Sequence, residues 1–397
     1  MPTLFRERHG GHGAEVTPLE LFFDLVFVIA VTQVSHALLE HLSWSGALEG
    51  AILLSMIWTA WIYTTWIANW LDPQHPLVRI VLLVLMGIGI VMSASLPEAF
   101  GERGLVFAAA YVTFQLFRSL LMLWAVRENP ALFRNFQRVT VWLTTAGILW
   151  IAGGLAEPET RVIIWLIALA VEYLGPAVTF FVPGLGRSDT RDWNIDGAHI
   201  AERAGLFVLI ALGESILVTG MAFANSVWSV PVIAAMAVSL IGSTAMWWIY
   251  FDRAASAAAG TIAASDDPGR IARVAYTYVP LLLIAGIVVV AVGDELVLHH
   301  PEGHADLATA LVVLGGPAIY LLGAALFKLS VFGVWSPTRF GGVVVLLAMV
   351  PLAAMVSPLI LSALSTGVLV LVALIEGIFL ARSPDHYGSK PQARPQK

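Results

Sequence analysis

The sequence contains no cysteine and little charge. Without cysteine, the chain forms no disulfide and no thiolate metal site, and its redox compartment cannot be read from the sequence. Charged residues make up 12% of the 397 residues, whereas soluble domains contain about 25%. This leaves too little polar surface to coat a water-soluble globule of this length. The sequence therefore predicts a protein whose main solvent is lipid.

The sequence contains many long apolar segments. Hydrophobic residues make up 58% of the chain, and the mean hydropathy is +0.83. A helix needs roughly 20 apolar residues to cross hydrocarbon about 30 Å thick, and runs of this length without strict alternation are not barrel strands. We therefore predict an all-α, polytopic helical membrane protein. About twelve spans are expected, at residues 19–40, 46–70, 77–96, 104–126, 139–155, 161–182, 199–224, 228–251, 273–296, 307–331, 339–356 and 359–381.

The basic residues indicate the orientation of these spans. Of the 21 lysines and arginines, all but four fall in the two tails or in loops on the same side of the membrane. Only Arg103 and Arg161 fall on the other side, and Arg118 and Arg203 lie within spans. Because cytoplasmic loops carry the excess of basic residues, both termini are expected in the cytoplasm.

Two halves of the chain show a weak internal similarity. The segment LVFVIAVTQ (25–33) aligns with LFVLIALGE (206–214), and SMIWT (55–59) aligns with SLIGS (239–243). We interpret this as a 6+6 parallel repeat, one of the known transporter architectures. The expected organisation is a cytoplasmic segment (1–18), a first six-helix repeat (19–182), a cytoplasmic linker (183–198), a second repeat (199–382) and a disordered cytoplasmic tail (383–397).

Several polar and ionisable residues fall inside the expected spans. A charged residue at the centre of a membrane helix costs about 2.5–3.5 kcal/mol on insertion scales, and such residues usually face a bundle interior or a cavity. At 1.5 Å per residue, Asp24 lies about 8 Å and Glu214 about 21 Å from the cytoplasmic start of its span. The candidates for a substrate or ion path are Glu20, Asp24, His36, Arg118, Glu172, His199, Glu202, Arg203, Glu214 and Ser215.

The same residues have a purely structural alternative. Acids near a span end are often solvated at the interface, and deep charges can be ion pairs that only hold helices together. We expect Arg118 to lie within about 4 Å of a carboxylate from another helix, because an unpaired buried guanidinium costs several kcal/mol. We also expect spans 19–40 and 199–224 to line the centre of the bundle. Their polar residues should share one interior with a residue of span 104–126; the residues expected there are Asp24, Ser35, Arg203, Glu214 and Arg118.

Other chemistry has less support in the sequence. Three histidines and three acids could hold a metal in an outer loop, although histidine-rich loops are more often solvated. They are His299, His300, His304, Asp294, Glu295 and Asp306. The sequence contains no P-loop, Rossmann glycine motif, G-x-S-x-G or H-E-x-x-H. Basic residues are scattered rather than clustered, so nucleic acid is not an expected partner. We predict no cofactor, no metal and no catalytic residue.

Two motifs resemble those of a known family. TPLELFFDLVFVIAVTQVSH (17–36) and HIAERAGLFVLIALGESIL (199–217) are similar to segments of the bacterial low-temperature-requirement A family of multi-spanning membrane proteins. The resemblance covers nearly the whole chain and implies a bacterial inner or plasma membrane location. Ala204 stands where that family often has histidine or an aromatic residue. A looser similarity links LFFDLVFVIAVT (21–32) to the F-S-D helix of lysosomal potassium channels, with Phe23 in place of the serine.

These observations favour a transporter or channel for a cation or a small protonatable solute, including protons. Five deep acids against two deep arginines predict a negative interior, with carboxylates along a path between the two six-helix halves. One alternative is a membrane-embedded enzyme acting on a lipid or isoprenoid, which would need a one-sided polar pocket. Another is a structural or signalling protein, in which every charge is paired and no cavity exists.

Overall fold

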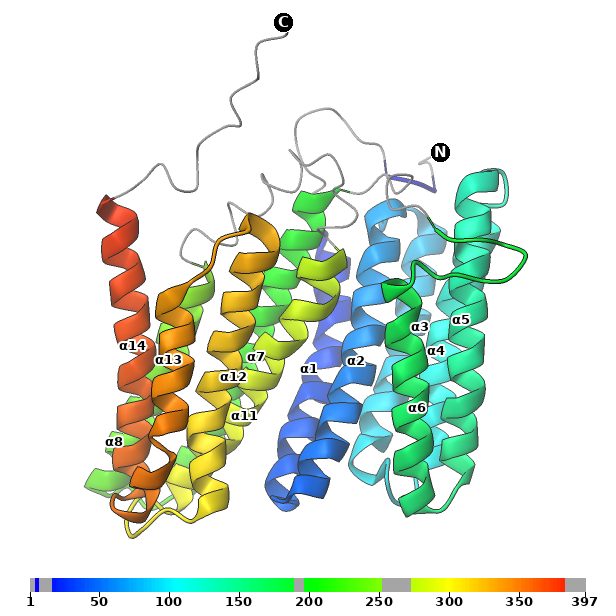
Figure 1. The fold of residues 1–397 in the computed structure, drawn as a ribbon. Helices are drawn as coiled ribbons and strands as arrows, with labels where there is room; N and C mark the ends of the chain where they lie inside the picture. The colour runs from blue at the N-terminus through cyan, green and yellow to red at the C-terminus, as the bar shows by residue number, and fades with distance from the viewer. Residues whose placement is uncertain (1–3, 7–15, 189–195, 252–272, 383–397) are drawn as a thin grey trace, which may run out of the picture.

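The protein is a bundle of roughly parallel helices. The computed structural model describes residues 4–6, 16–188, 196–251 and 273–382 (Figure 1). Within these residues, twelve helices are long and apolar enough to cross a membrane. The predicted polytopic helical fold is confirmed. We call the end of the bundle at which α1 begins and α14 ends the terminal face, and the opposite end the far face.

The first group of helices covers residues 18–177. The bounds are α1 (Pro18–Glu40), α2 (Trp44–Trp70), α3 (Pro76–Ser95, continued by a 3-10 turn, Leu96–Glu98), α4 (Gly104–Ala125), α5 (Pro130–Leu155) and α6 (Pro158–Ala177). Polar residues begin several of them by accepting hydrogen bonds from the free backbone N–H groups of the first turn. Thr17 and Glu20 form a reciprocal capping box at the start of α1, and Ser43 caps α2.

The second group covers residues 197–382 with one gap. The bounds are α7 (Gly197–Asn225), α8 (Val230–Phe251), a π-helical turn (Arg273–Tyr278) that runs into α11 (Val279–His299), α12 (Leu307–Phe332), α13 (Pro337–Ala348, followed by a 3-10 segment, Val350–Ala354) and α14 (Pro358–Arg382). Pro280 has no N–H to donate to the carbonyl four residues earlier, which disturbs the α-helical pattern just before α11.

Most helix bounds agree with the predicted spans to within a few residues. The predicted division at Ser357 and Pro358 is confirmed, because α14 begins at Pro358. Helix α5 begins nine residues before the predicted start at position 139, because Asn129 caps it and its first turns are too polar for a hydropathy window. Helix α6 ends at Ala177 rather than at 182, because Thr179 and Phe180 take positive φ angles of 54° and 49°.

The helices pack as two groups that meet along one seam. In Figure 1, α1–α6 lie on one side of the bundle and α7–α14 on the other. Within the first group α1 contacts α2 and α3, and α3, α4, α5 and α6 contact one another in sequence. The second group has the corresponding contacts: α7 with α8 and α11, and α11, α12, α13 and α14 in sequence. At the seam, α1 and α2 contact α7 and α11.

The seam does not join equivalent surfaces of the two groups. Helix α11 contacts both α1 and α2, whereas α3, which has the corresponding position in the first group, makes no comparable contact with α7. Contact between α1 and α7 agrees with the expectation that spans 19–40 and 199–224 lie together at the centre. The surrounding packing is asymmetric, so the seam is not a simple two-fold interface.

Candidate functional site

A charged network joins α1 to α7 close to the terminal face. Glu20 accepts hydrogen bonds from Arg6 at 2.8 Å and from Arg203 at 3.1 Å, and its Oε1 lies 2.8 Å from His199 Nε2. The side chains of Glu20 and His199 are completely buried. Arg203 also donates to Asp24, one turn along α1. The capping box places Glu20 in the first turn, and its i+4 neighbour Asp24 lies on the same face.

The network extends to α2 through its aromatic and amide side chains. Trp61 donates its indole N–H to Asp24 at 2.7 Å, and the Arg203 guanidinium lies 5.6 Å from the centre of the Trp61 ring. This arrangement combines a charge-assisted hydrogen bond with a cation–π contact. Trp61 therefore connects the charges of α1 and α7 to the apolar packing of α2.

The hydrogen bonds around His199 define the state of its ring. Asn69 accepts from the Asp196 backbone N–H at 2.9 Å, so its amide nitrogen is the group that lies 3.2 Å from His199 Nδ1. An amide nitrogen can only donate, so Nδ1 accepts and the proton sits on Nε2, from which it is donated to the shorter contact, Glu20 at 2.8 Å. Arg6 Nη2, which lies 3.2 Å from the same Nε2, makes no hydrogen bond to the ring in this tautomer. We infer a neutral imidazole from this pattern.

The network balances its own charge. The guanidinium groups of Arg6 and Arg203 face the carboxylates of Glu20 and Asp24, with a neutral His199 between them. Paired and hydrogen-bonded charges offset much of the cost of removing them from water. The negative interior expected from counting acids is therefore not formed at this end of the seam.

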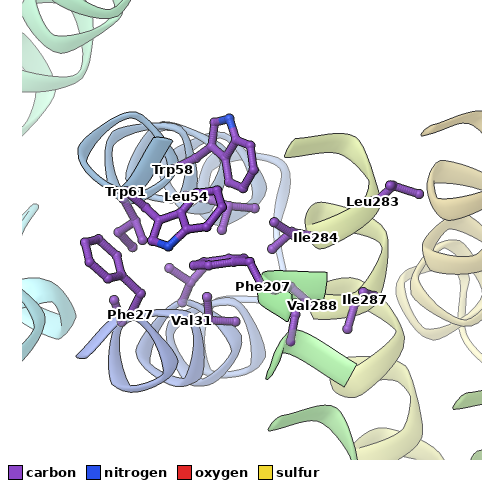
Figure 2. Close-up of a cluster of buried hydrophobic side chains, with 14 of the residues drawn as sticks. Phe27, Val31, Leu54, Trp58, Trp61, Phe207, Leu283, Ile284, Ile287 and Val288 are labelled. Atoms are coloured by element: carbon purple, nitrogen blue, oxygen red, sulfur yellow. The ribbon is translucent and has the colours of Figure 1, made fainter. Parts of the chain in front are cut away.

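An apolar aromatic cluster follows the charged network along the seam. It consists of Phe27, Val31, Leu54, Trp58, Trp61, Phe207, Leu283, Ile284, Ile287 and Val288. Figure 2 shows Phe207 at its centre, between α1, α2 and α11. The Phe207 ring centre lies 4.4 Å from that of Trp61, 5.6 Å from Trp58 and 6.4 Å from Phe27. These side chains are almost fully buried and fill the middle of the seam.

A second carboxylate lies beyond the aromatic cluster. Glu214 on α7 is 6% exposed, and it accepts a hydrogen bond from the Thr32 hydroxyl of α1. It lies eleven residues after Arg203, or about 16 Å toward the far face. Among the described residues it has no salt bridge. The neighbouring Ser215 is also buried, and its hydroxyl has no hydrogen-bond partner within the described chain.

Arg118 does not join the seam. It lies on α4 and donates to the Ala60 carbonyl at 2.9 Å and to the Thr64 hydroxyl at 3.2 Å. Its guanidinium also lies over the rings of Tyr63 and Phe114. The prediction of a carboxylate within 4 Å is wrong for the described residues, because backbone carbonyl, hydroxyl and ring faces surround this cation instead.

Glu172 has partners of its own inside the first group of helices. Both its oxygens accept from the Tyr111 hydroxyl at 2.8 Å, and Gln115 and Trp150 also donate to it. This set of donors satisfies the carboxylate without a cation. Glu172 is therefore buried as predicted, but it lies apart from the seam between the two groups.

Two other sequence candidates lie at the surface. The side chains of His36 on α1 and Glu202 on α7 are exposed. Each follows a buried seam residue directly, Ser35 and Ala201 respectively, and so lies about 100° around its helix from it. The structure thus brings together Glu20, Asp24, His199 and Arg203, with Glu214 and Ser215 further along the same seam.

Several residues with buried polar contacts were not predicted from the sequence. Arg6 was assigned only to a cytoplasmic segment, and Trp61 and Asn69 only to an apolar span. Asp294, which was treated as part of the histidine-rich loop, is a buried residue of α11 that accepts a hydrogen bond from Ser239. Its position inside predicted span 273–296 was the signal that could have identified it.

The possible metal site in the outer loop gains no support. The described residues contain no group of three or more histidines and acids placed to hold a metal ion. His299 bonds instead to the Glu295 carbonyl. Asp306 caps α12, and its hydrogen bonds with Thr309 lower the pKa of that carboxyl.

Comparison with known proteins places the sequence near one family. Residues 15–374 match the family model described as bacterial low temperature requirement A protein (LtrA). The sequence is 40% identical over 362 residues to an uncharacterized protein of Rhizobium meliloti (strain 1021), covering 91% of this chain and 88% of that relative. No solved structure matches the chain.

Proposed function

This chain belongs to the bacterial low temperature requirement A family, and on that premise we propose that it is a gated transport protein for a small cation or protons. The path follows the seam between α1, α2, α7 and α11. It is closed in this structure by the aromatic cluster, with Phe207 at its centre. The chain is an integral membrane protein with twelve candidate spans among its described residues, which is the setting that this function requires.

Glu214 is the observation that carries the proposal. A carboxylate that is 6% exposed and bonded to one hydroxyl has little to offset its removal from water. Acids inside membrane bundles commonly mark ion pathways and proton relays, because a passing cation or proton provides the missing charge. Glu214 lies on the seam, on the far side of the aromatic cluster from Asp24 and Arg203.

The aromatic cluster is suited to act as a gate. An apolar constriction excludes water, and a hydrated ion cannot cross it without losing its shell. Opening requires Phe207 to move out of the space between Trp61 and Phe27. Trp61 also contacts Arg203 and Asp24, so a change in the charged network shifts one wall of the gate. In this scheme the network holds the gate closed and Glu214 receives the cation.

The two rival functions account for less of the seam. An enzyme acting on lipid would need a nucleophile with its base, or a metal group, and the described residues hold no such metal group. A structural role agrees with the paired network of Glu20 and Arg203. It gives no reason for Glu214, which is buried without a cation among the described residues.

The wider organisation remains part of the proposal. We assign residues 19–182 and 199–382 to a parallel repeat, supported by the corresponding helix contacts within the two groups. We place both termini in the cytoplasm and the protein in the bacterial plasma membrane, on the basis of the basic loops and the family. Residues 1–3, 7–15, 189–195, 252–272 and 383–397, which include most of the expected tails and linker, lie outside the described residues.

The gate is tested by flux into liposomes that contain the purified protein. Potassium, sodium and proton fluxes are measured with and without a proton gradient, for the wild-type protein and for Phe207→Ala. We expect the variant to raise flux of the transported cation about tenfold or more, because losing even about 1.4 kcal/mol of barrier has that effect. Phe223→Ala on the same helix, which is stacked on Trp228 outside the cluster, should behave as wild type. No flux of any of these ions in either protein contradicts the proposal.

Glu214→Gln tests the carboxylate itself. If transport uses protons, this change should abolish flux or remove its pH dependence, because an amide cannot bind and release a proton. Glu40→Gln, an exposed acid at the end of α1, is the matched control and should leave the pH profile unchanged. A folded Glu214→Gln protein with wild-type flux and pH profile would exclude Glu214 from the mechanism.

A further inference from the structure

A separate pocket opens in the first group of helices, away from the seam carboxylates. It lies where α2, α4, α5 and the end of α6 meet the π-helical turn before α11. Its empty space measures about 580 Å³, including the part at its mouth. The residues that line it belong to the ends of these helices nearer the terminal face.

Five aromatic rings line the pocket. They are Tyr63, Trp66 and Trp70 of α2, Phe136 of α5, and Phe180 just after α6. The Trp66 and Trp70 ring centres are 6.5 Å apart, and Trp70 meets Phe136 edge to face at 5.6 Å. Such walls favour a flat apolar molecule, because rings gain from stacked and edge-on contacts beyond simple burial.

Two arginines line the same pocket without a carboxylate partner. Arg118 is 1% exposed, and Arg273 lies at the start of the π-helical turn. Neither has an acid within 4 Å among the described residues. Glu172 lines a smaller adjoining pocket, but its oxygens are held by Tyr111, Gln115 and Trp150. The pocket is therefore positively charged as well as apolar.

Polar atoms of three lining residues have no partner. They are Nε of Arg118, Nε of Arg273 and Oδ1 of Asn135, none of which makes a hydrogen bond within the described chain. Buried polar groups normally have partners, and each exception requires an explanation. Two unused N–H donors and one unused acceptor match a ligand that carries an anionic group and one hydrogen-bond donor.

We propose that this pocket binds a small organic anion with a flat apolar body. The carboxylate or phosphate of the ligand accepts hydrogen bonds from Arg118 and Arg273, its ring system packs against the wall formed by Trp66, Trp70 and Phe136, and an N–H or hydroxyl donates to Asn135. The same chemistry could be presented by the headgroup of an anionic lipid, and the experiment below distinguishes the two sources. This inference does not depend on the proposed transport function.

Binding is measured by calorimetry on the full chain in phosphatidylcholine nanodiscs. The probes are indole-3-carboxylate and its neutral amide, which share the flat body and the ring N–H. We expect the carboxylate to bind wild-type protein about tenfold or more tightly than the amide, since hydrogen bonds between a guanidinium and a carboxylate are stronger than those to a neutral amide. Equal binding of the two probes to wild type, or no binding of either, overturns the proposal.

Variants then assign the site. Arg273→Gln should remove most of the preference for the carboxylate, and Asn135→Asp should weaken carboxylate binding further by adding a like charge. Arg134→Gln removes an exposed charge one residue from Asn135 and should bind both probes as wild type does. Arg118→Gln is informative only if the variant protein folds. The assignment of the site therefore rests on Arg273→Gln. Unchanged carboxylate preference in a folded Arg273→Gln protein rejects this pocket as the site.

A second set of nanodiscs identifies the source of the anion. They contain phosphatidylglycerol in place of part of the phosphatidylcholine. If a lipid headgroup occupies the pocket, the apparent affinity of wild type for indole-3-carboxylate should fall several-fold in these discs, with no such fall for Arg273→Gln. An unchanged affinity assigns the pocket to a soluble anion. Both results support an anion site.

Discussion

At the scale of the residue, Arg203 is the centre of the charged network. It donates to both Glu20 and Asp24 and lies over the Trp61 ring. Arg203→Met should lower the free energy of unfolding by about 3–5 kcal/mol, because it leaves buried carboxylates without their cation. The change in stability is measured by thermal unfolding of the purified protein in detergent.

A surface ion pair provides the matched control for that variant. Arg127 lies 3.6 Å from Glu128, and both side chains are largely exposed. Arg127→Met should change stability by no more than about 1 kcal/mol, since exposed pairs contribute little. If Arg127→Met and Arg203→Met lower stability equally, the network does not hold α1 and α7 together.

Single residues were predicted from the sequence with mixed success. Helical spacing correctly placed Glu20 and Asp24 on one face, and depth along the helix indicated that Glu214 is buried. The sequence could not show which neighbour satisfies a charge, so Arg118 was assigned a carboxylate that it lacks. Backbone carbonyls and ring faces leave no trace in a charge count, and residues distant in sequence, such as Arg6 and Asn69, become partners only in the fold.

At the scale of the element, α11 and α12 are the most closely packed pair. Glycines allow their backbones to approach: a Cβ added to Gly286 would lie 2.6 Å from the backbone nitrogen of Tyr320, and one added to Gly316 would lie 2.7 Å from that of Val290. Small residues serve this purpose in membrane bundles, where close packing replaces the hydrophobic effect. Packing against α12 holds α11 in place, and α11 contributes side chains to the aromatic cluster.

Adjacent glycines give a direct test of this packing. Gly316→Ala should lower the free energy of unfolding by about 1–3 kcal/mol, because the added methyl group overlaps backbone atoms of α11. Gly315→Ala adds the same group where no atom lies within 4 Å, and should be neutral or stabilising by up to about 1 kcal/mol. The two variants are compared by their melting temperatures in detergent. Equal melting temperatures would mean that the two helices can move apart without cost.

The helices themselves were the most predictable level of the structure. Length and hydropathy determine where a chain must cross lipid, so all the predicted spans have a counterpart among the described helices. The differences lie at helix ends, where hydropathy is weak. Helix α5 is longer than its predicted span because its first turns are polar. Helix α6 ends earlier than its predicted span because Thr179 and Phe180 have positive φ angles. The contact between α1 and α7 was expected from their polar residues, but the asymmetry of the seam was beyond any pattern in the sequence.

At the scale of the whole molecule, the proposed topology rests on the distribution of the basic residues. Reporter fusions at Glu98, Glu157 and Glu302 should report the outside of the cytoplasmic membrane. Fusions at Asn129, Asp189 and Asp267 should report the cytoplasm. The last two positions are not among the residues that the structure describes. The physical reason is the excess of lysine and arginine on the loops of one side. A clear reversal at any of these positions would contradict twelve spans with cytoplasmic termini.

The link between Asp24 and Arg203 also constrains how the protein is made. The two residues are 179 positions apart in the chain. At a synthesis rate of about 5–20 residues per second, α1 leaves the ribosome on the order of 10–40 s before its partner on α7 exists. During that interval Asp24 is without the cation that it pairs with in the finished fold, so this part of the seam assembles only after α7 has been inserted. The order of synthesis thereby places formation of this contact after the first six helices have been made.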